Sequence, residues 1–377
     1  MDLMPSEFTL SRRRIGISLG DITALEGGGL GEFCLQIGRR LAAALATTAT
    51  GPFSLAFHVR PPLIGAFGDQ VDYLPVRRLH RHVHRQPERF DLWHTLHQLS
   101  KHRPPIGAGV RLVTVHDLNY LYGRSAFSRW RHQRRTSALL ARSDALTAIS
   151  RHTAGDVRRH LGWQGDITVI PNGARSLLAE PQSPLPGWAA QPQRPFLLHL
   201  SRMSPAKNPQ ALLALAVAWP GMSFVLAGPR NHDTRALEST TRLPNVQFCL
   251  DITEAQKAWA YAHCTGFLFP SLTEGFGLPP IEAMHFGKPV FLSRLTSLPE
   301  IGGDAADYFD DFDGPAMRAV VERGLARWRA EPGRADAIRA HAAQFDWDRA
   351  ADAYLALYAR LLGLDDPVAP ACAAAPG

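Results

Sequence analysis

Short apolar runs of strand character alternate with amphipathic, helix-like stretches along the first half of the chain. A helical pattern at residues 30 to 45, for example, lies between two such runs. Strands that alternate with helices are typical of a parallel sheet covered by helices. The pattern predicts an α/β domain over residues 1 to 175, with strands at residues 14 to 20, 53 to 59, 90 to 94, 110 to 117, 144 to 150 and 166 to 173.

The alternation stops between residues 176 and 194, a segment rich in Pro, Ala and Gln that has no clear period. We interpret it as a linker. A second α/β domain is predicted over residues 195 to 345, then a helix at 346 to 363 and a tail, 364 to 377, that we expect to be frayed. Two doubly wound domains should form a ligand cleft where the carboxyl ends of their strands face each other. The strands expected in the second domain are residues 196 to 201, 223 to 228, 246 to 250, 265 to 269 and 289 to 293.

The composition agrees with a two-domain α/β protein. The chain has 377 residues, of which 45% are hydrophobic and 20% charged, enough for two domains of ordinary size. Its four cysteines lack CxxC spacing, so neither a disulfide framework nor a zinc site is predicted. No apolar stretch approaches the roughly 18 residues that span a bilayer, and the first 20 residues lack the apolar core of a signal peptide. We expect a cytoplasmic protein.

The positive charge is unevenly distributed. Lys and Arg exceed Asp and Glu by seven, and residues 76 to 90 and 124 to 135 are dense in Arg and His. A basic surface in the first half could contact an anionic membrane, nucleic acid or acidic substrates, or it could simply be a solvated face.

Residues 269 to 284, FPSLTEGFGLPPIEAM, combine two carboxylates with glycines and a double proline. The prolines predict that Glu282 lies in the first turn of a helix and Glu274 in the loop before it. Gly275 and Gly277 can take a positive φ and leave backbone N–H groups open to a ligand. A helix N-terminus binds anions, whereas carboxylates accept hydrogen bonds from hydroxyls. The motif predicts a polyol joined to an anion, although either carboxylate alone could complement the helix dipole or face water.

Two cations and a histidine occupy similar positions at strand ends. Arg202 and Lys207 flank the first strand-to-helix turn of the second domain, where they could grip a diphosphate together with the helix N-terminus. In the first domain, His116 and Asp117 follow an apolar strand, which is where α/β enzymes hold catalytic groups. Most histidines, of which the chain has 16, are nevertheless structural or exposed.

Two further patterns fit known ligand motifs poorly. The glycine run at residues 27 to 29 does not match GxGxxG, and it favours close approach of the backbone to a phosphate or sugar instead. The sequence DFD at residues 311 to 313 matches a metal signature of another class of sugar transferase. It lies just before a helical pattern, however, and Asp313 is predicted to cap that helix. We therefore predict no metal site.

Together these motifs resemble the retaining glycosyltransferase family 4, which has the GT-B fold. The most specific element is the family's E-x7-E motif, here Glu274 and Glu282. Arg202 and Lys207 resemble its GR…K loop, although Ser201 replaces the usual glycine. IPNG at residues 170 to 173, LPEIGG at 298 to 303 and the closing helix, which crosses back to the first domain in such enzymes, follow in the family's order.

The resemblance implies transfer of a sugar, with retention, from a GDP- or UDP-linked donor without an obligatory metal. In the family, Glu282 would hold the ribose, Glu274 with the Phe276 and Gly277 backbone the sugar, and Arg202 with Lys207 the diphosphate. Gly28, Gly29, Gly275 and Leu278 complete the expected donor-binding set, and His116 and Glu274 are the expected catalytic residues.

Within the family, the chain resembles bacterial transferases that build lipopolysaccharide or exopolysaccharide. The partners implied are a nucleotide sugar, a glycan or lipid-linked acceptor and an anionic membrane, but no nucleic acid. Two alternatives stay open. A GT-B sugar-nucleotide epimerase would share the donor site, and a nucleic-acid-binding protein would explain the Arg and His runs but not the glycine loop.

Overall fold

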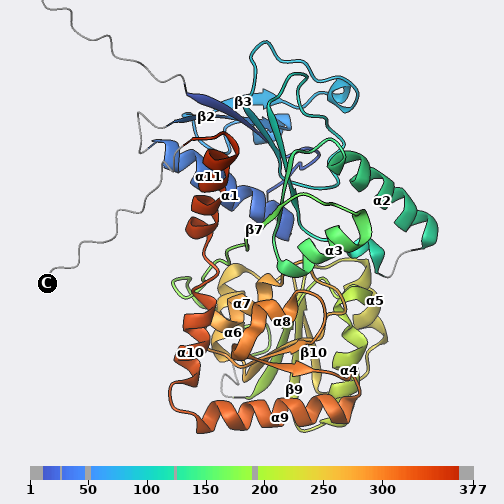
Figure 1. Ribbon diagram of the computed structural model, residues 1–377. Coiled ribbons are helices and arrows are strands. Elements are labelled where there is room, and N and C mark those ends of the chain that lie inside the picture. The colour runs from blue at the N-terminus through green and yellow to red at the C-terminus, as the bar shows by residue number, and fades with distance from the viewer. Residues whose placement is uncertain (1–11, 26–27, 47–51, 123–124, 189–193, 365–377) are drawn as a thin grey trace, which may run out of the picture.

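Two α/β units are stacked one above the other in the computed structural model (Figure 1). The structure describes residues 12–25, 28–46, 52–122, 125–188 and 194–364. Apart from Leu364, the predicted tail lies outside these ranges, as do Gly27, Arg124 and Cys372. Among the described residues, no helix is both long enough and apolar enough to cross a membrane.

The first domain is built on a parallel sheet of seven strands in the order β3-β2-β1-β4-β5-β6-β7. The order reverses at β1, which is the signature of a doubly wound sheet. Its central strands are nearly continuous apolar runs because helices cover both faces. The strands are β1 (Arg13–Ser18), β2 (Phe53–Val59), β3 (Asp72–Pro75), β4 (Leu92–Thr95), β5 (Val110–Val115), β6 (Ala145–Ala148) and β7 (Ile167–Val169).

Helices connect these strands. Ser125 and Ser150 cap α2 and α3 by accepting hydrogen bonds from Ser128 N and Thr153 N, as expected for N-cap serines. The helices of this part are α1 (Gly29–Ala46), α2 (Ala126–Leu140), α3 (Arg151–Leu161) and the short 3₁₀ turns η1 (Pro61–Leu63), η2 (Arg78–Arg81) and η3 (Asn119–Leu121).

The second domain repeats the design with six parallel strands in the order β10-β9-β8-β11-β12-β13. The order again reverses at the first strand, so the carboxyl ends of β8 and β11 lie side by side at the switch point. The strands are β8 (Phe196–Leu200), β9 (Ser223–Gly228), β10 (Val246–Leu250), β11 (Gly266–Phe269), β12 (Val290–Ser293) and β13 (Ala306–Phe309).

Helices again cover both faces of this sheet (Figure 1). They are α4 (Pro209–Ala218), α5 (His232–Thr240), α6 (Glu254–His263), α7 (Leu278–His285), α8 (Leu298–Gly302), α9 (Gly314–Ala330) and α10 (Arg334–Ala342), with 3₁₀ turns η4 (Pro205–Lys207) and η5 (Gly303–Ala305).

The last helix, α11 (Trp347–Leu361), packs against the first domain rather than the second (Figure 1). Trp347, Tyr354 and Tyr358 are buried in the same core cluster as strands β1 and β2. The Tyr358 hydroxyl shares a hydrogen bond of 2.7 Å with Nδ1 of His94 on β4. The chain thus crosses between the two sheets twice.

The prediction of two α/β units with parallel sheets is confirmed, but two strands were missed. Strand β3 is a short edge strand that ends in Pro75 and is half exposed, and β13 is also only four residues long. Neither gives an apolar run. The described part of the expected linker contains no helix or strand, yet Leu177, Leu185 and Trp188 are buried in the second domain's core.

Candidate active site

The carboxyl ends of the two sheets meet directly at a glycine loop. This loop, residues 270–277, follows β11, and its Gly275 carbonyl accepts a hydrogen bond of 2.9 Å from Ser150 Oγ, at the end of β6. A Cβ atom at Gly275 would lie 2.3 Å from the His116 carbonyl oxygen. Only glycine fits so close a backbone approach.

Two more contacts join the domains around this point, and one contact within the first domain supports them. Thr273 Oγ1 donates to Asn119 Oδ1, and Thr153 Oγ1 donates to the His116 carbonyl at 3.2 Å. The carboxylate of Glu300 accepts hydrogen bonds from the first backbone N–H groups of α3, at 2.9 Å from Arg151 N. Both domains therefore contribute contacts that hold this region in place.

Two neighbouring hydroxyl residues fix the backbone of the loop. Ser297 Oγ is within hydrogen-bond distance of the carbonyls of Glu274 and Phe276, at 3.1 and 2.9 Å, and Thr296 Oγ1 accepts from Glu274 N at 3.0 Å. Gly277 has φ 121°, as the sequence predicted. Gly275 does not have a positive φ, so it is needed for space rather than for its backbone conformation.

The helix after the loop begins earlier than predicted. Helix α7 starts at Leu278, so both prolines lie inside its first turn and Glu282 falls in the second turn. The N–H groups of a first turn have no partner within the helix, so prolines are tolerated there. The prediction that Glu282 lies in the first turn is wrong.

Glu282 is held by two residues of α6. Its carboxylate forms an ion pair of 2.9 Å with Lys257 Nζ and accepts a hydrogen bond of 2.8 Å from the Tyr261 hydroxyl. Burial opposes the charge on Lys257, but the nearby Glu282 and Glu254 carboxylates raise its pKa above the usual value. Burial, and then the charge of Glu282, also raise the pKa of Tyr261, so its hydroxyl remains a donor.

Lys207 and Glu274 form a second ion pair. Lys207 Nζ donates to Glu274 Oε1, and it also lies 5.4 Å from the centre of the Phe269 ring. Both side chains are largely buried, with 22% and 11% exposed. The structure therefore brings together the cation expected at a phosphate and the carboxylate expected at a sugar.

Hydrogen bonds of His199 and Ser201 fix the turn that carries Arg202. His199 Nδ1 donates to the Leu268 carbonyl at 2.8 Å, so the neutral ring accepts at Nε2 from Ser201 Oγ at 2.7 Å. Ser201 Oγ in turn accepts from Met203 N at 3.0 Å. These contacts hold Met203 at φ 53° and leave the Arg202 side chain exposed at the turn. The serine that replaces the family's glycine stabilises the turn.

The start of α1 approaches the same place from the first domain. A Cβ atom at Gly28 would lie 3.4 Å from Arg202 Nη2, and one at Gly29 would lie 3.9 Å from Leu278 Cδ1. The structure thus brings two glycines of the first domain against two residues expected in the donor site.

His116 lies at the carboxyl end of the first sheet and is 7% exposed. Its Nε2 donates to the Leu96 carbonyl at 2.8 Å, which leaves the lone pair of the neutral ring on Nδ1. Burial, with a smaller effect of His97, lowers the pKa of His116 to about 3. The ring is therefore neutral near pH 7, and the edge of Phe33 packs against it at 4.6 Å between ring centres.

Two family models match the chain. The model described as "Glycosyltransferase Family 4" matches residues 27–175, and the model described as "Glycosyl transferases group 1" matches residues 186–309. The chain belongs to glycosyltransferase family 4. Its resemblance to this family, and its classification as a glycosyltransferase, are thereby confirmed.

Curated relatives of this glycosyltransferase include two mannosyltransferases of Escherichia coli. The O-antigen chain mannosyltransferase B is 34% identical over 164 residues, which are 41% of this chain and 42% of the relative. The serotype-specific mannosyltransferase WbdA is 39% identical over 246 residues, 59% of this chain and 29% of the relative. The chain thus spans less than half the length of either relative.

Solved structures agree on the fold. Sucrose-phosphate synthase from Thermosynechococcus elongatus superposes with a TM-score of 0.70 at 20% identity, over 93% of this chain and 100% of that one. Anabaena HepE in complex with UDP-glucose superposes with a TM-score of 0.67 at 16% identity, over 92% and 99% of the chains. The glycosyltransferase has the GT-B fold, as predicted.

Sequence reasoning missed several residues of this site. Lys257 and Tyr261 are one helical turn apart on α6 and face Glu282, but a Lys and a Tyr four residues apart are common on any helix. Ser297 and Ser150 contact the loop only through the tertiary fold. No local pattern identifies such contacts.

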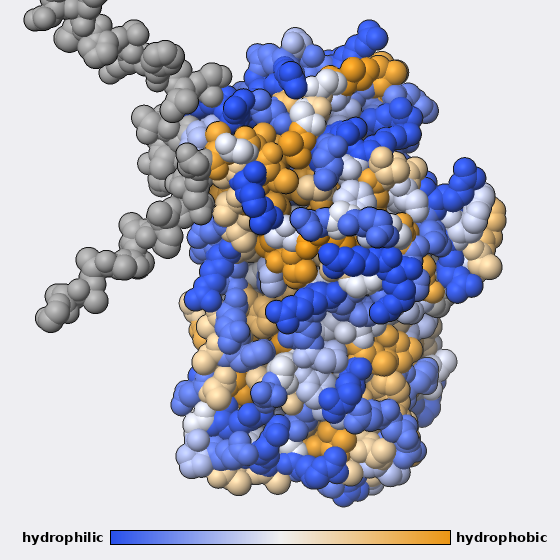
Figure 2. Space-filling view, viewed as in Figure 1, coloured by the Kyte–Doolittle hydropathy of each residue, from blue (hydrophilic) through white to orange (hydrophobic). Residues whose placement is uncertain are grey.

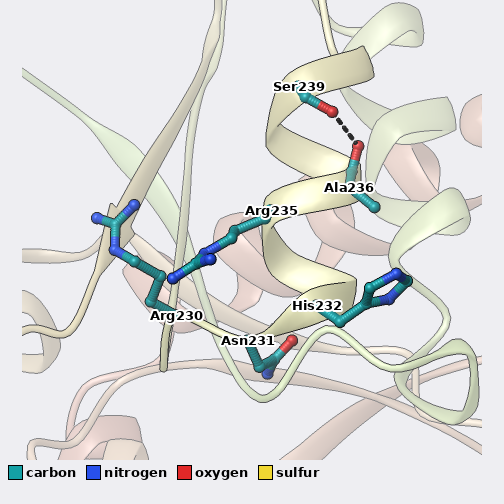
Figure 3. Close-up of a pocket in the computed structure, with 6 residues that line it drawn as sticks. All are labelled: Arg230, Asn231, His232, Arg235, Ala236 and Ser239. Atoms are coloured by element: carbon teal, nitrogen blue, oxygen red, sulfur yellow. Dashed lines mark hydrogen bonds between the residues drawn. The ribbon is translucent and has the colours of Figure 1, made fainter.

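A surface pocket lies beside the Arg202 turn, on α5 (Figure 3). In Figure 3 the side chains of Arg230 and Arg235 extend to the same side of this helix. Asn231, which caps α5, donates to the Arg202 carbonyl at 3.0 Å. The pocket therefore adjoins the site without containing its carboxylates.

The two Arg and His runs differ in structure. In the run at residues 76 to 90, the arginines Arg77, Arg78, Arg85 and Arg89 are exposed, as a basic surface requires. His80 and His84 are instead buried beside His58 of β2. In the second run, Phe127 and Trp130 of α2 are 70% and 52% exposed. Asp313 caps α9 by accepting from Ala316 N at 3.3 Å, so its prediction as a helix cap is confirmed.

Proposed function

We propose that this glycosyltransferase moves a hexose, with retention, from a nucleotide diphosphate to a glycan or lipid-linked acceptor in cell-surface polysaccharide synthesis. The names of its mannosyltransferase relatives favour mannose as the sugar and an O-antigen type of acceptor. The observation that carries the proposal is the pair of carboxylates, Glu274 and Glu282, each held by a lysine beside the glycine loop.

The charges around the loop suit a nucleotide sugar. Glu282, oriented by Lys257 and Tyr261, can accept hydrogen bonds from the ribose hydroxyls, and Glu274 from the sugar hydroxyls. Lys207 and Arg202 supply positive charge for the diphosphate beside the N-terminus of α7. Lys207 would exchange part of its contact with Glu274 for phosphate oxygens when the donor binds.

We further propose same-face substitution. Breaking the anomeric bond places positive charge on the sugar and negative charge on the diphosphate, and groups matched to those changes lower the barrier. The acceptor oxygen attacks as the diphosphate leaves, and the leaving group takes the acceptor proton. Neutral His116 orients the sugar. The two cations and the α7 N-terminus neutralise the diphosphate, so this site requires no divalent ion.

The direct test incubates the protein with labelled GDP- and UDP-sugars, with and without a lipid-linked acceptor. Sugar should pass to the acceptor with retention of anomeric configuration. An isomerised sugar nucleotide formed without acceptor would establish the epimerase alternative instead, and lack of turnover with every donor would contradict both.

Arg202→Ala and Glu282→Ala test the donor site. Losing one charge-assisted contact costs about 1.5 to 3 kcal/mol, or about ten- to a hundredfold in affinity. The exposed Glu322→Ala on α9 and the exposed Arg242→Ala are matched controls that should bind the nucleotide sugar normally. Calorimetric titration that finds wild-type affinity in both test variants would reject this assignment.

We also propose that α2 docks the first domain on an anionic membrane that carries the acceptor. The helix contains no acidic residue, and its exposed Phe127 and Trp130 rings stack with their centres 5.8 Å apart. The helix protrudes at the right of Figure 1, and the same place in Figure 2 shows apolar atoms beside hydrophilic ones. Arg134 lies 5.1 Å from the Trp130 ring. Apolar rings with flanking Arg are the chemistry of interfacial helices.

Vesicle co-sedimentation tests this docking. Binding should require anionic lipid and weaken with salt, since each basic residue at such a surface contributes about 1 kcal/mol. Replacing Phe127 and Trp130 with Ser should reduce binding, whereas replacing the exposed Leu178 with Ser should not. Binding that ignores lipid charge would contradict the proposal.

A further inference from the structure

Three buried histidines converge at the carboxyl edge of the first sheet, away from the candidate active site. His58 is the last residue but one of β2, His80 belongs to η2, and His84 follows η2. They are 0%, 7% and 1% exposed. One ring nitrogen from each lies within 4.8 Å of the others. His58 Nε2 and His80 Nδ1 are 2.9 Å apart.

Outer contacts orient two of these rings. His84 Nδ1 donates to the Arg103 carbonyl at 2.8 Å, which leaves the lone pair of the neutral ring on Nε2. His58 Nδ1 lies 2.9 Å from Ser18 Oγ, which can accept from it and so free Nε2. A histidine whose other nitrogen donates to a carbonyl or hydroxyl is the usual outer arrangement of a metal ligand.

A fourth histidine is incompletely satisfied. His102 is 3% exposed, its ring centre lies 5.8 Å from that of His58, and its Nδ1 is buried without a hydrogen-bond partner. The Asp21 carboxylate oxygen Oδ1 lies 3.8 Å from this nitrogen, beyond hydrogen-bond distance. A buried polar atom without a partner lowers stability. Four imidazoles therefore stabilise this part of the core less than apolar side chains would.

The rings are uncharged at neutral pH. Burial, and then the neighbouring histidines, lower the pKa of His58 to about 2 and that of His80 to about 4. Neutral imidazole is the form that binds transition metals. At present His80 Nδ1 accepts weakly from Arg77 N at 3.3 Å, and His84 Nε2 accepts from Gln86 Nε2 at 2.8 Å. A metal ion would replace both contacts.

We propose that His58 Nε2, His80 Nδ1 and His84 Nε2 bind one transition-metal ion, with His102 on the fourth side. Zn²⁺ fits nitrogen ligands in a tetrahedral site. Zn–N distances of about 2.0 to 2.1 Å place ligand nitrogens about 3.4 Å apart in a tetrahedron. The 2.9 Å pair must therefore open slightly and the third ring must move closer, both within the reach of side-chain rotation.

The ion would have a structural role. It would fasten the segment around η2 to strand β2. The sheet order β2-β1-β4-β5 separates the strand of His58 from that of His116 by three strand spacings, about 14 Å. The ion would thus lie outside the proposed donor site. Arg60 and Arg81, which pair with Asp21 at 3.1 Å, place positive charge near the site and lower its affinity for a metal ion. The affinity must therefore be measured as well as the stoichiometry.

The experiment uses the full chain without a histidine tag, stripped with a chelator and titrated with Zn²⁺ against a chromogenic competitor. We expect one tightly bound Zn²⁺ per chain and a higher Tm with zinc. His84→Gln should weaken zinc binding more than a hundredfold. Even replacing a residue that only orients a metal ligand lowers metal affinity ten- to a hundredfold. The exposed His82→Gln, from the same run, is the matched control and should bind normally.

Ser18→Ala is a milder variant that keeps all the ring nitrogens, and it should weaken zinc binding about tenfold. It serves if His84→Gln does not fold. The proposal is overturned if the wild-type chain binds no stoichiometric zinc, or if His82→Gln weakens binding as much as the test variants. In either case the rings form only a hydrogen-bonded cluster.

Discussion

At the scale of single residues, the carboxylates of Glu274 and Glu282 are held in place without a bound nucleotide sugar. Lys207 fixes Glu274, and Lys257 with Tyr261 fixes Glu282. Acceptors oriented in advance lose less entropy when a polyol binds. The lysines also neutralise two carboxylates that would otherwise repel a diphosphate.

Tyr261→Phe tests this orientation of Glu282. The variant keeps the ring in the core and removes one hydrogen bond of 2.8 Å. Losing a bond to a charged group costs about 1.5 kcal/mol, so nucleotide-sugar affinity should fall about tenfold in calorimetric titration. Tyr308→Phe, which loses a bond of 2.7 Å to the Gly303 carbonyl, should leave affinity unchanged. Equal effects of the two variants would show that Tyr261 acts through stability alone.

His116→Ala tests the proposed chemistry. We expect kcat to fall with a smaller change in donor affinity, because the neutral ring is proposed to act on the sugar as the bond breaks. The control is His160→Ala, which changes an exposed residue at the end of α3. No glycosyl-enzyme should accumulate during turnover. A covalent sugar trapped on Glu274 by mass spectrometry would reject same-face substitution, and an unchanged kcat would remove His116 from the mechanism.

At the scale of elements, the buried strands were predictable because each is a continuous apolar run. Strands β2, β9 and β10 have the predicted bounds. Strands β3 and β13 were missed because they are short and partly exposed. The histidine cluster and the two lysine pairs were missed for another reason. Lys207 and Glu274 are 67 residues apart, so only the order of the strands brings them together.

Helix α9 offers a test of the DFD sequence. Asp313 accepts from Ala316 N, and Asp311 accepts from Asp313 N at 3.0 Å, so both carboxylates serve the helix start. Asp313→Ala should lower the free energy of unfolding by about 1 kcal/mol, measured by urea denaturation. Asp311→Ala should keep full transferase activity. Activity that is lost in chelator and restored by Mg²⁺ or Mn²⁺ would contradict metal independence of the donor site.

At the scale of the whole molecule, each domain contains fully buried histidines that bridge its elements. His94 connects β4 to Tyr358 of α11 and to Thr114 at 2.7 Å, and His199 supports the Arg202 turn. Burial lowers the pKa of His94 to about 3 and that of His199 to about 4. The folded state therefore resists protonation at positions that join its parts.

This makes the fold sensitive to acid. A histidine in the unfolded chain binds its proton near pH 6.5, whereas His199 in the folded state does so only near pH 4. Between these values the unfolded state binds more protons, so stability is fully present above about pH 7 and is lost as the pH falls. By pH 5 each such ring lowers the free energy of unfolding by about 2 kcal/mol.

His199→Asn should reduce by about that amount the stability lost between pH 7 and 5, measured by urea denaturation. His232→Asn, which changes a histidine whose side chain is 96% exposed, should leave the loss unchanged. Parallel pH profiles for all three proteins would show that buried histidines do not govern the acid response.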